Sequence, residues 1–127
     1  MKSSIINLFL QKKILLDSFK EAFNSEVKEY ERLLKITGST IPLYLEEDEE
    51  LYISKIGFIH LLEQFSSENL STIYLAYICD CLSLAEDLRC ENEELKEIIF
   101  ELADPEINGG YKSGGEIKTI ILKIQSQ

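Results

Sequence analysis

The sequence contains one histidine, three cysteines and no tryptophan. The histidine, His60, has apolar neighbours on its expected helix and no local nucleophile or orienting carboxylate, so no catalytic pair is recognisable. We expect His60 to be structural or partly exposed and the protein not to be an enzyme. The odd number of cysteines is incompatible with a complete set of internal disulfides, so Cys79, Cys81 and Cys90 are expected to be core thiols in a reducing compartment.

Motifs for metal ions and phosphates are also lacking. Cys79 and Cys81 lie two residues apart on an expected helix, where their side chains point about 200° apart and do not readily share a tetrahedral zinc ion. A zinc site would need one of them together with Cys90 and His60, which is a less favoured alternative. The segment NGGYKSGG lacks the residue order of a phosphate-binding loop, and EEDEE lacks the alternation and the glycine of a calcium loop. We therefore expect no cofactor and no metal ion.

Long apolar runs are absent, since no stretch approaches the ~20 residues that cross a bilayer. The first residues, MKSSIINLFLQKKILL, are interrupted by Asn7 and by the polar residues 11–13, unlike the apolar centre of a secretory signal. We therefore expect a cytoplasmic protein.

Basic residues are scarce in the middle of the chain. Residues 1–40 hold seven Lys or Arg against five Asp or Glu, residues 41–110 hold three against seventeen, and residues 111–127 hold three against one. The balances of +2, −14 and +2 give the net charge of −10. Such a field repels nucleic acids and anionic membranes and attracts cationic surfaces. The segregation of charge favours a binding role over a role in solubility alone.

The composition is that of one globular domain. With 127 residues, of which 45% are apolar and 28% charged, the chain is long enough to enclose a single core. Apolar residues recur at helical spacing almost throughout. We expect a mainly α fold, a single helical domain over residues 1–127 built as a bundle of about five or six helices, with a short β-hairpin near residues 42–54 as an option.

The first expected helix runs from Ser4 to Phe23. Its apolar face comprises Ile5, Leu8, Phe9, Leu15, Leu16, Phe19 and Phe23. Asn24 and Ser25 then offer capping oxygens, and the helical spacing continues to a stop at Gly38. This segment is either a second helix or a bent continuation of the first.

Helical spacing resumes at Ile56, with Ile59, Leu62 and Phe65 on one face. The candidate N-cap Ser67 precedes the most regular pattern of the chain, which predicts a central helix between residues 70 and 88.

Two further helices follow in the C-terminal third. Asn92 is a candidate N-cap, and Pro105 marks the end of the helix that it begins. Ser113 and Glu116 have capping-box spacing, so residues 116–125 are expected to form a last short helix. The β-branched residues of this segment leave a terminal strand as the other option.

Five consecutive carboxylates occupy residues 46–50 in the stretch LEEDEELY. The flanking segments PLYL and LYIS have β character, so the acidic run is expected at the tip of a loop or weak hairpin. A second acidic stretch, AEDLRCENEELKE, spans the junction of two expected helices, and both stretches would form one acidic surface if the loop folds over that junction. Tyr44 and Tyr52 flank the run as aromatic anchors or as core or rim residues. The candidate partner-binding residues are Tyr44, Glu46, Glu47, Asp48, Glu49, Glu50, Tyr52, Glu86, Asp87, Glu91, Glu93 and Glu94.

With these features the chain resembles the small acidic immunity proteins that neutralise secreted bacterial toxins, including those of contact-dependent growth inhibition systems. The resemblance rests on the single-domain size, on the charge of LEEDEELY and AEDLRCENEELKE, on the lack of a catalytic set, and on the helical tract NEELKEIIFELADPEINGGY. It implies a cognate toxin with a basic surface as the partner, and first of all a nuclease, whose cationic groove the carboxylates would cover in place of phosphates. No binding to nucleic acid or membrane is expected.

The alternative function is that of a DNA mimic or regulatory adaptor, which would use the same field to bind a basic nucleic-acid-binding protein of its own cell. The acidic surface alone does not separate the two functions. The position of the gene would, because an immunity gene is expected directly after a toxin gene.

Overall fold

The computed structural model describes residues 1–36, 43, 45–66, 71–103 and 113–126. This part of the chain is mainly helical, as the spacing of the apolar residues predicts. Its helices are α1 (Ser3–Leu10), α2 (Leu16–Leu34), α3 (Lys55–Ser66), α4 (Ser71–Ser83), α5 (Glu93–Leu102) and α6 (Gly114–Gln125), and its two short strands are β1 (Tyr52–Ile53) and β2 (Arg89–Cys90).

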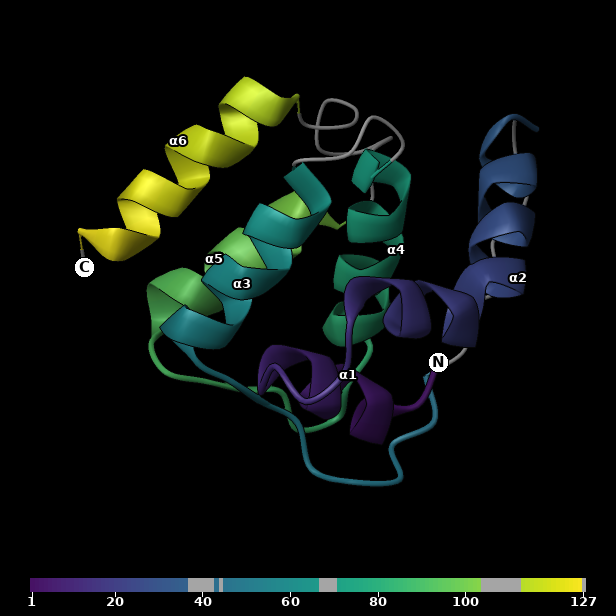
Figure 1. Ribbon diagram of the computed structural model, residues 1–127, viewed down its shortest axis with the longest axis horizontal. Coiled ribbons are helices and arrows are strands. Elements are labelled where there is room, and N and C mark those ends of the chain that lie inside the picture. The colour runs from purple at the N-terminus through teal and green to yellow at the C-terminus, as the bar shows by residue number, and fades with distance from the viewer. Residues whose placement is uncertain (37–42, 44, 67–70, 104–112, 127) are drawn as a thin grey trace.

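Helix α4 occupies the middle of the molecule, where it contacts α2, α3 and α5. Helix α6 packs on α3, and α1 contacts both α2 and α3, so that α6 and α2 lie on opposite sides of the molecule in Figure 1. Every residue from Leu75 to Leu82 is buried, which confirms the prediction of a central helix. The helix ends at Ser83, however, and not near residue 88 as expected.

The core is rich in aromatic rings where α1, α2, α3 and α4 meet. Phe9 and Phe19 stack with their ring centroids 4.2 Å apart, and Phe65 meets both rings edge to face. Phe23 continues the cluster to Tyr77 on α4. Aromatic pairs of this geometry add to the free energy gained from burying their area.

The expectation of one helix from Ser4 to Phe23 is wrong. The chain leaves α1 after Leu10, passes through a left-handed backbone conformation at Lys12 (φ 61°) and begins α2 at Leu16. A continuous helix would hold Phe9 and Phe19 about 15 Å apart along its axis, whereas the reversal lets their rings stack. The stacking of these rings therefore favours the break.

Leu15 and Ile56, which helical spacing assigns to buried faces, lie on the surface. Leu15, just before α2, is 79% exposed, and Ile56 in the first turn of α3 is 72% exposed. Gly57, beside Ile56, sits where an added Cβ atom would meet the backbone oxygen of Leu10 at 3.2 Å, so this glycine permits the close approach of α3 to α1.

The sequence left open whether the segment beyond Phe23 is a second helix or a bent continuation. It is a bent continuation, because α2 runs through Phe23 and its backbone departs from helical geometry at that residue. The expected stop at Gly38 lies outside the described residues. Three hydrogen bonds join α2 to α4, between the pairs Asn24 and Tyr74, Glu26 and Tyr77, and Tyr30 and Asp80. Their sequence separations of 50, 51 and 50 residues are nearly constant, so the two helices run in the same direction.

The helix starts predicted from capping residues near the C-terminus are confirmed. The side chain of Asn92 accepts a hydrogen bond from the backbone N–H of Leu95 at the start of α5. Ser113 and Glu116 form the capping box of α6, so the last segment is a helix and not a strand. Helix α5 ends at Leu102, and the predicted stop at Pro105 and the candidate cap at Ser67 lie outside the described residues.

The β-hairpin considered near residues 42–54 does not form in the described part of that segment. β1 pairs in parallel with the distant β2, in the register Tyr52 with Arg89 and Ile53 with Cys90. Leu51 and Ile53 are both buried, so this end of the segment belongs to the core and not to an exposed hairpin.

Candidate functional site

The acidic run 46–50, here called the acidic strap, passes along the N-terminal end of α1. Its first residue is fixed by the backbone: the N–H of Glu46 donates to the Met1 carbonyl at 2.8 Å, and the N–H of Ser3 donates to the Glu46 carbonyl at 2.9 Å. The strap is therefore not the tip of a hairpin. It is a segment tied to the first helix of the chain.

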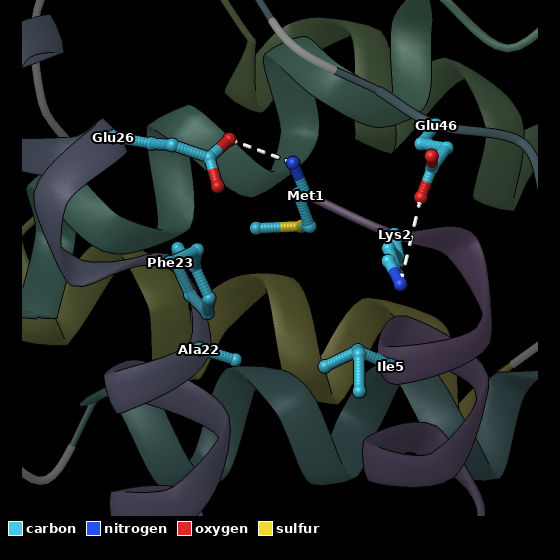
Figure 2. Close-up of a pocket in the computed structure, with 7 residues that line it drawn as sticks. All are labelled: Met1, Lys2, Ile5, Ala22, Phe23, Glu26 and Glu46. Atoms are coloured by element: carbon cyan, nitrogen blue, oxygen red, sulfur yellow. Dashed lines mark hydrogen bonds and ion pairs between the residues drawn. The ribbon is translucent and has the colours of Figure 1, made fainter.

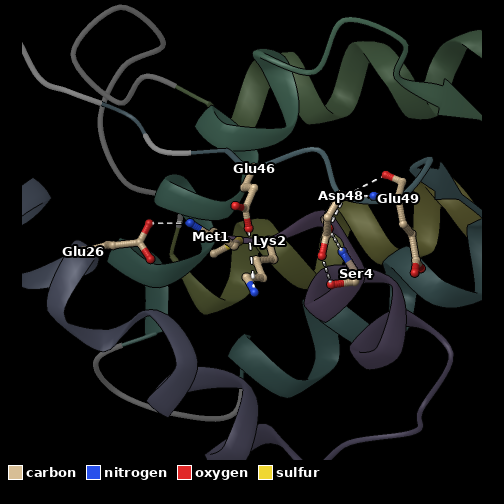
Figure 3. A network of polar contacts seen from close by, with 8 residues as sticks. Met1, Lys2, Ser4, Glu26, Glu46, Asp48 and Glu49 are labelled. Atoms are coloured by element: carbon tan, nitrogen blue, oxygen red, sulfur yellow. Dashed lines mark hydrogen bonds and ion pairs between the residues drawn. The ribbon is translucent and has the colours of Figure 1, made fainter.

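Asp48 caps α1. One of its carboxylate oxygens accepts the backbone N–H of Ser4 at 2.9 Å and lies 3.0 Å from the Ser3 hydroxyl, and the other accepts the Ser4 hydroxyl at 2.6 Å (Figure 3). The residue before α1, Lys2, provides no side-chain cap. Asp48, although far away in the sequence, supplies the hydrogen-bond acceptor that a helix N-terminus needs. The hydrogen bonds from Ser4 lower the pKa of Asp48 to about 2.

Ser3 and Asn7 hold the rest of the strap from the same helix. The Ser3 hydroxyl donates to the Glu49 carbonyl at 2.7 Å and accepts the Glu49 N–H at 3.0 Å. The side-chain amide of Asn7 donates to the Glu49 carboxylate and to the Glu50 carbonyl, both at 2.8 Å. Ser3 and Asn7 are themselves buried, so the strap is ordered by contacts from the interior.

The second acidic segment reaches the strap through the β1–β2 pairing. Because β1 follows the strap after one residue, Leu51, and β2 directly follows Leu88, the parallel pair places Glu86 and Asp87 beside residues 47–50. The carboxylate of Glu47 accepts the backbone N–H of Glu86 at 2.9 Å. The expectation that both acidic segments meet on one surface is thus met for these residues.

Between the two segments lies a groove of about 340 Å³, here called the acidic groove. It is lined by Glu47, Glu49, Glu50, Leu51, Glu86 and Asp87. One guanidinium stands at its edge: Nε of Arg89 lies 2.8 Å from the Glu50 carboxylate and 3.2 Å from that of Asp87. All three side chains are more than half exposed, so these pairs neutralise the groove only in part and are screened by water and salt.

The remaining candidates lie outside the groove. The Glu91 carboxylate accepts the first N–H of α3, that of Lys55, and pairs with the Lys55 ammonium at 3.6 Å. Glu93 and Glu94 occupy the exposed first turn of α5, where their charge favours the helix dipole. Tyr52 is 53% exposed and lies next to Arg89 in the strand pair, so it remains a candidate anchor. Tyr44 lies outside the described residues.

The lone histidine and the cysteines are part of the packing. His60 is half-buried with its ring 4.9 Å from that of Phe9, and burial lowers its pKa. Cys79 and Cys81 are fully buried and Cys90 is half-buried. Burial raises the pKa of all three thiols, that of Cys81 to about 12. Within the described ranges, no three His, Cys, Asp or Glu side chains are grouped as metal ligands would be.

The residues that sequence reasoning missed are those that hold the strap: Ser3, Ser4, Asn7 and Arg89. The signal was present in SSIIN, where two hydroxyls and an amide recur on a helical face that is otherwise apolar. The partners of Ser3, Ser4 and Asn7 in the strap are more than 40 residues away, so spacing alone could not identify these three.

No family model, curated protein or solved structure matches the chain. Among the described helices, none combines the length and the apolar character needed to span a membrane.

Proposed function

We propose that the protein is an immunity protein that binds a cognate bacterial toxin, a nuclease, in the cytoplasm and covers the toxin's cationic substrate groove with its acidic groove. The observation that carries the proposal is the meeting of two acidic segments, residues 47–50 and residues 86–87, around one hollow with five carboxylates. A nuclease binds phosphates with a row of basic side chains, and exposed carboxylates at the surface of an inhibitor can occupy the same positions.

The way the strap is held supports this use. Asp48 and the backbone of Glu49 are tied to α1, and this fixes the chain on which Glu47 and Glu50 stand. A binding surface that is ordered before it meets its partner loses less conformational entropy on association. The exposed carboxylates supply the long-range attraction that speeds the encounter, and Tyr52 offers an aromatic contact beside them.

The direct experiment uses the product of the gene immediately upstream as the toxin. Host cells would express the upstream product alone, the upstream product together with this protein, or neither protein. The two proteins would also be tested for co-purification. We expect death with the upstream product alone and survival with a stable complex when both are made. Harmless expression of the upstream product without a complex would overturn the proposal and leave a DNA mimic or adaptor as the better account.

A further inference from the structure

A second hollow, separate from the acidic groove, lies where the first residues of the chain and α1 meet α2 (Figure 2). Its volume is about 460 Å³, which is within the range of pockets that hold small molecules. It is lined by Met1, Lys2, Ile5, Ala22, Phe23, Glu26 and Glu46. None of these residues lines the acidic groove.

One side of the pocket is apolar. Ile5 lines it from α1, and Ala22 and the almost fully buried Phe23 line it from α2, with the Met1 side chain above these three in Figure 2. The side chain of Ala22 ends at Cβ and is exposed, so space remains open above α2 at this point. An apolar group of a ligand would be sheltered from water mainly against Ile5 and Ala22, because only 1% of the Phe23 surface is exposed.

The two carboxylates of the pocket differ in what they can still bind. Glu26 already accepts the Met1 ammonium at 2.7 Å and the Tyr77 hydroxyl at 2.6 Å through one oxygen. Glu46 lies 3.8 Å from the Lys2 ammonium, beyond hydrogen-bond distance, and both side chains are more than 60% exposed. The Lys2–Glu46 pair therefore faces the pocket as one cation and one anion that make no hydrogen bond with each other.

The backbone keeps these two charges side by side. Lys2 and Glu46 form a parallel β-bridge, closed by the hydrogen bonds of Glu46 with Met1 and Ser3. The side chains can bend away from each other at little cost because an exposed pair at this distance contributes little to stability. A ligand with both charges can enter between them without moving the backbone.

We propose that this pocket binds an α-amino acid with an apolar side chain. The ligand's carboxylate pairs with the Lys2 ammonium, its ammonium pairs with the Glu46 carboxylate, and its side chain lies against Ile5 and Ala22, above the buried Phe23. A ligand with only a positive charge would be repelled by Lys2, and one with only a negative charge by Glu46. A zwitterion whose two charges are one carbon apart satisfies both groups with charge-assisted hydrogen bonds.

The test is a titration of the full chain with L-phenylalanine, followed by two-dimensional ¹⁵N–¹H NMR. We expect amide shifts at Lys2, Ile5, Ala22, Phe23 and Glu46 that saturate in the millimolar range or below. Glycine lacks the side chain, phenethylamine lacks the carboxylate and 3-phenylpropionate lacks the ammonium, so each should bind about tenfold more weakly or worse. No shifts at these residues with phenylalanine, or equal shifts with glycine, would overturn the proposal.

Variants of the pocket complete the test. Ala22→Leu fills the space without changing the charge and should abolish the phenylalanine shifts, whereas Ala22→Ser, of nearly the same size, should retain them. Lys2→Gln and Glu46→Gln alter exposed side chains and should each weaken binding, which keeps the test decisive if Ala22→Leu does not fold. Binding that survives in folded Ala22→Leu would contradict the assignment. None of these outcomes depends on whether a toxin is the partner.

Discussion

Asp48 shows that an exposed carboxylate of the acidic strap can have a role in folding. It accepts hydrogen bonds from the backbone N–H and the hydroxyl of Ser4 at the N-terminus of α1, a position that favours a negative charge. Its neighbours Glu47 and Glu50 point to the acidic groove instead. Five consecutive acidic residues thus have different tasks, which the letters EEDEE do not distinguish.

The Asp48→Asn variant tests this role through pH. Because hydrogen bonds from Ser4 lower the folded-state pKa of Asp48 to about 2, its ionised form contributes stability that is fully present above the unfolded pKa, near 4. That contribution is lost as the pH falls from about 4 to about 2. We expect Asp48→Asn to melt several degrees below the natural sequence at pH 7, and the difference to shrink towards zero at pH 2.

The matched control is Glu97→Gln, which removes one negative charge from an exposed position on α5. Its melting temperature should follow the natural sequence across the same pH range. A constant difference between Asp48→Asn and the natural sequence from pH 7 to pH 2 would mean that Asp48 does not cap α1 through its charge.

The three thiols give a second test at this scale. Burial raises the pKa of Cys79 and Cys81, and both are enclosed in α4, so neither forms the reactive thiolate at pH 8. With iodoacetamide at pH 8 we expect only the half-buried Cys90 to react in the folded protein, and slowly, and all three in urea. Mass spectrometry of the labelled peptides would measure this, and rapid labelling of Cys79 would show that α4 is not the core helix.

At the scale of elements, the reversal between α1 and α2 separates two apolar residues that periodicity treats alike. Phe19 is fully buried in the aromatic cluster, whereas Leu15 is 79% exposed. We expect Phe19→Ala to lower the free energy of unfolding by about 3–5 kcal/mol and Leu15→Ala to change it by less than about 0.5 kcal/mol. Urea unfolding followed by circular dichroism measures both, and similar losses for the two variants would favour one continuous helix.

This reversal also marks what the sequence could and could not predict. Caps that act within four residues, such as Asn92 on Leu95 and the Ser113–Glu116 box, were predictable because donor and acceptor are neighbours in the chain. The break after Leu10 was not, because the stacking of Phe9 on Phe19 that favours it is a contact that appears only in three dimensions. Similarly, the parallel pairing of Tyr52 with Arg89 depends on how α3 and α4, which lie between these residues in the sequence, are packed.

At the scale of the whole molecule, the negative field is concentrated where the strap meets the start of β2. The sequence indicated that residues 46–50 and 86–87 would share a surface if the loop folded over the helix junction, and the β1–β2 pairing brings them together. It also predicted Glu91, Glu93 and Glu94 for the same surface, but these side chains serve the starts of α3 and α5 and do not line the groove. For Glu93 and Glu94 this position follows from the neighbouring cap Asn92, whereas the contact of Glu91 with Lys55 joins residues far apart in the sequence.

A variant of the acidic groove tests whether this concentration of charge matters for binding. It carries the substitutions Glu47→Gln, Glu50→Gln, Glu86→Gln and Asp87→Asn and spares Asp48 and Glu49. We expect its fold and melting temperature to be nearly unchanged, because the exposed pairs with Arg89 contribute little to stability. Association with a cationic partner should slow by about tenfold or more at low salt, and the difference should fall as salt is added.

The control variant removes the same number of negative charges elsewhere on the surface. Its substitutions are Glu21→Gln, Glu31→Gln, Glu97→Gln and Glu101→Gln. Because these side chains lie outside the groove, the control separates the effect of position from the effect of net charge.

The most direct measurement is the survival of cells that express the upstream gene product together with the natural protein, the groove variant or the control variant. The account predicts growth with the natural protein and with the control variant, and loss of protection with the groove variant at equal levels of folded protein. Full protection by the groove variant would contradict the claim that the acidic groove is the surface that binds the toxin.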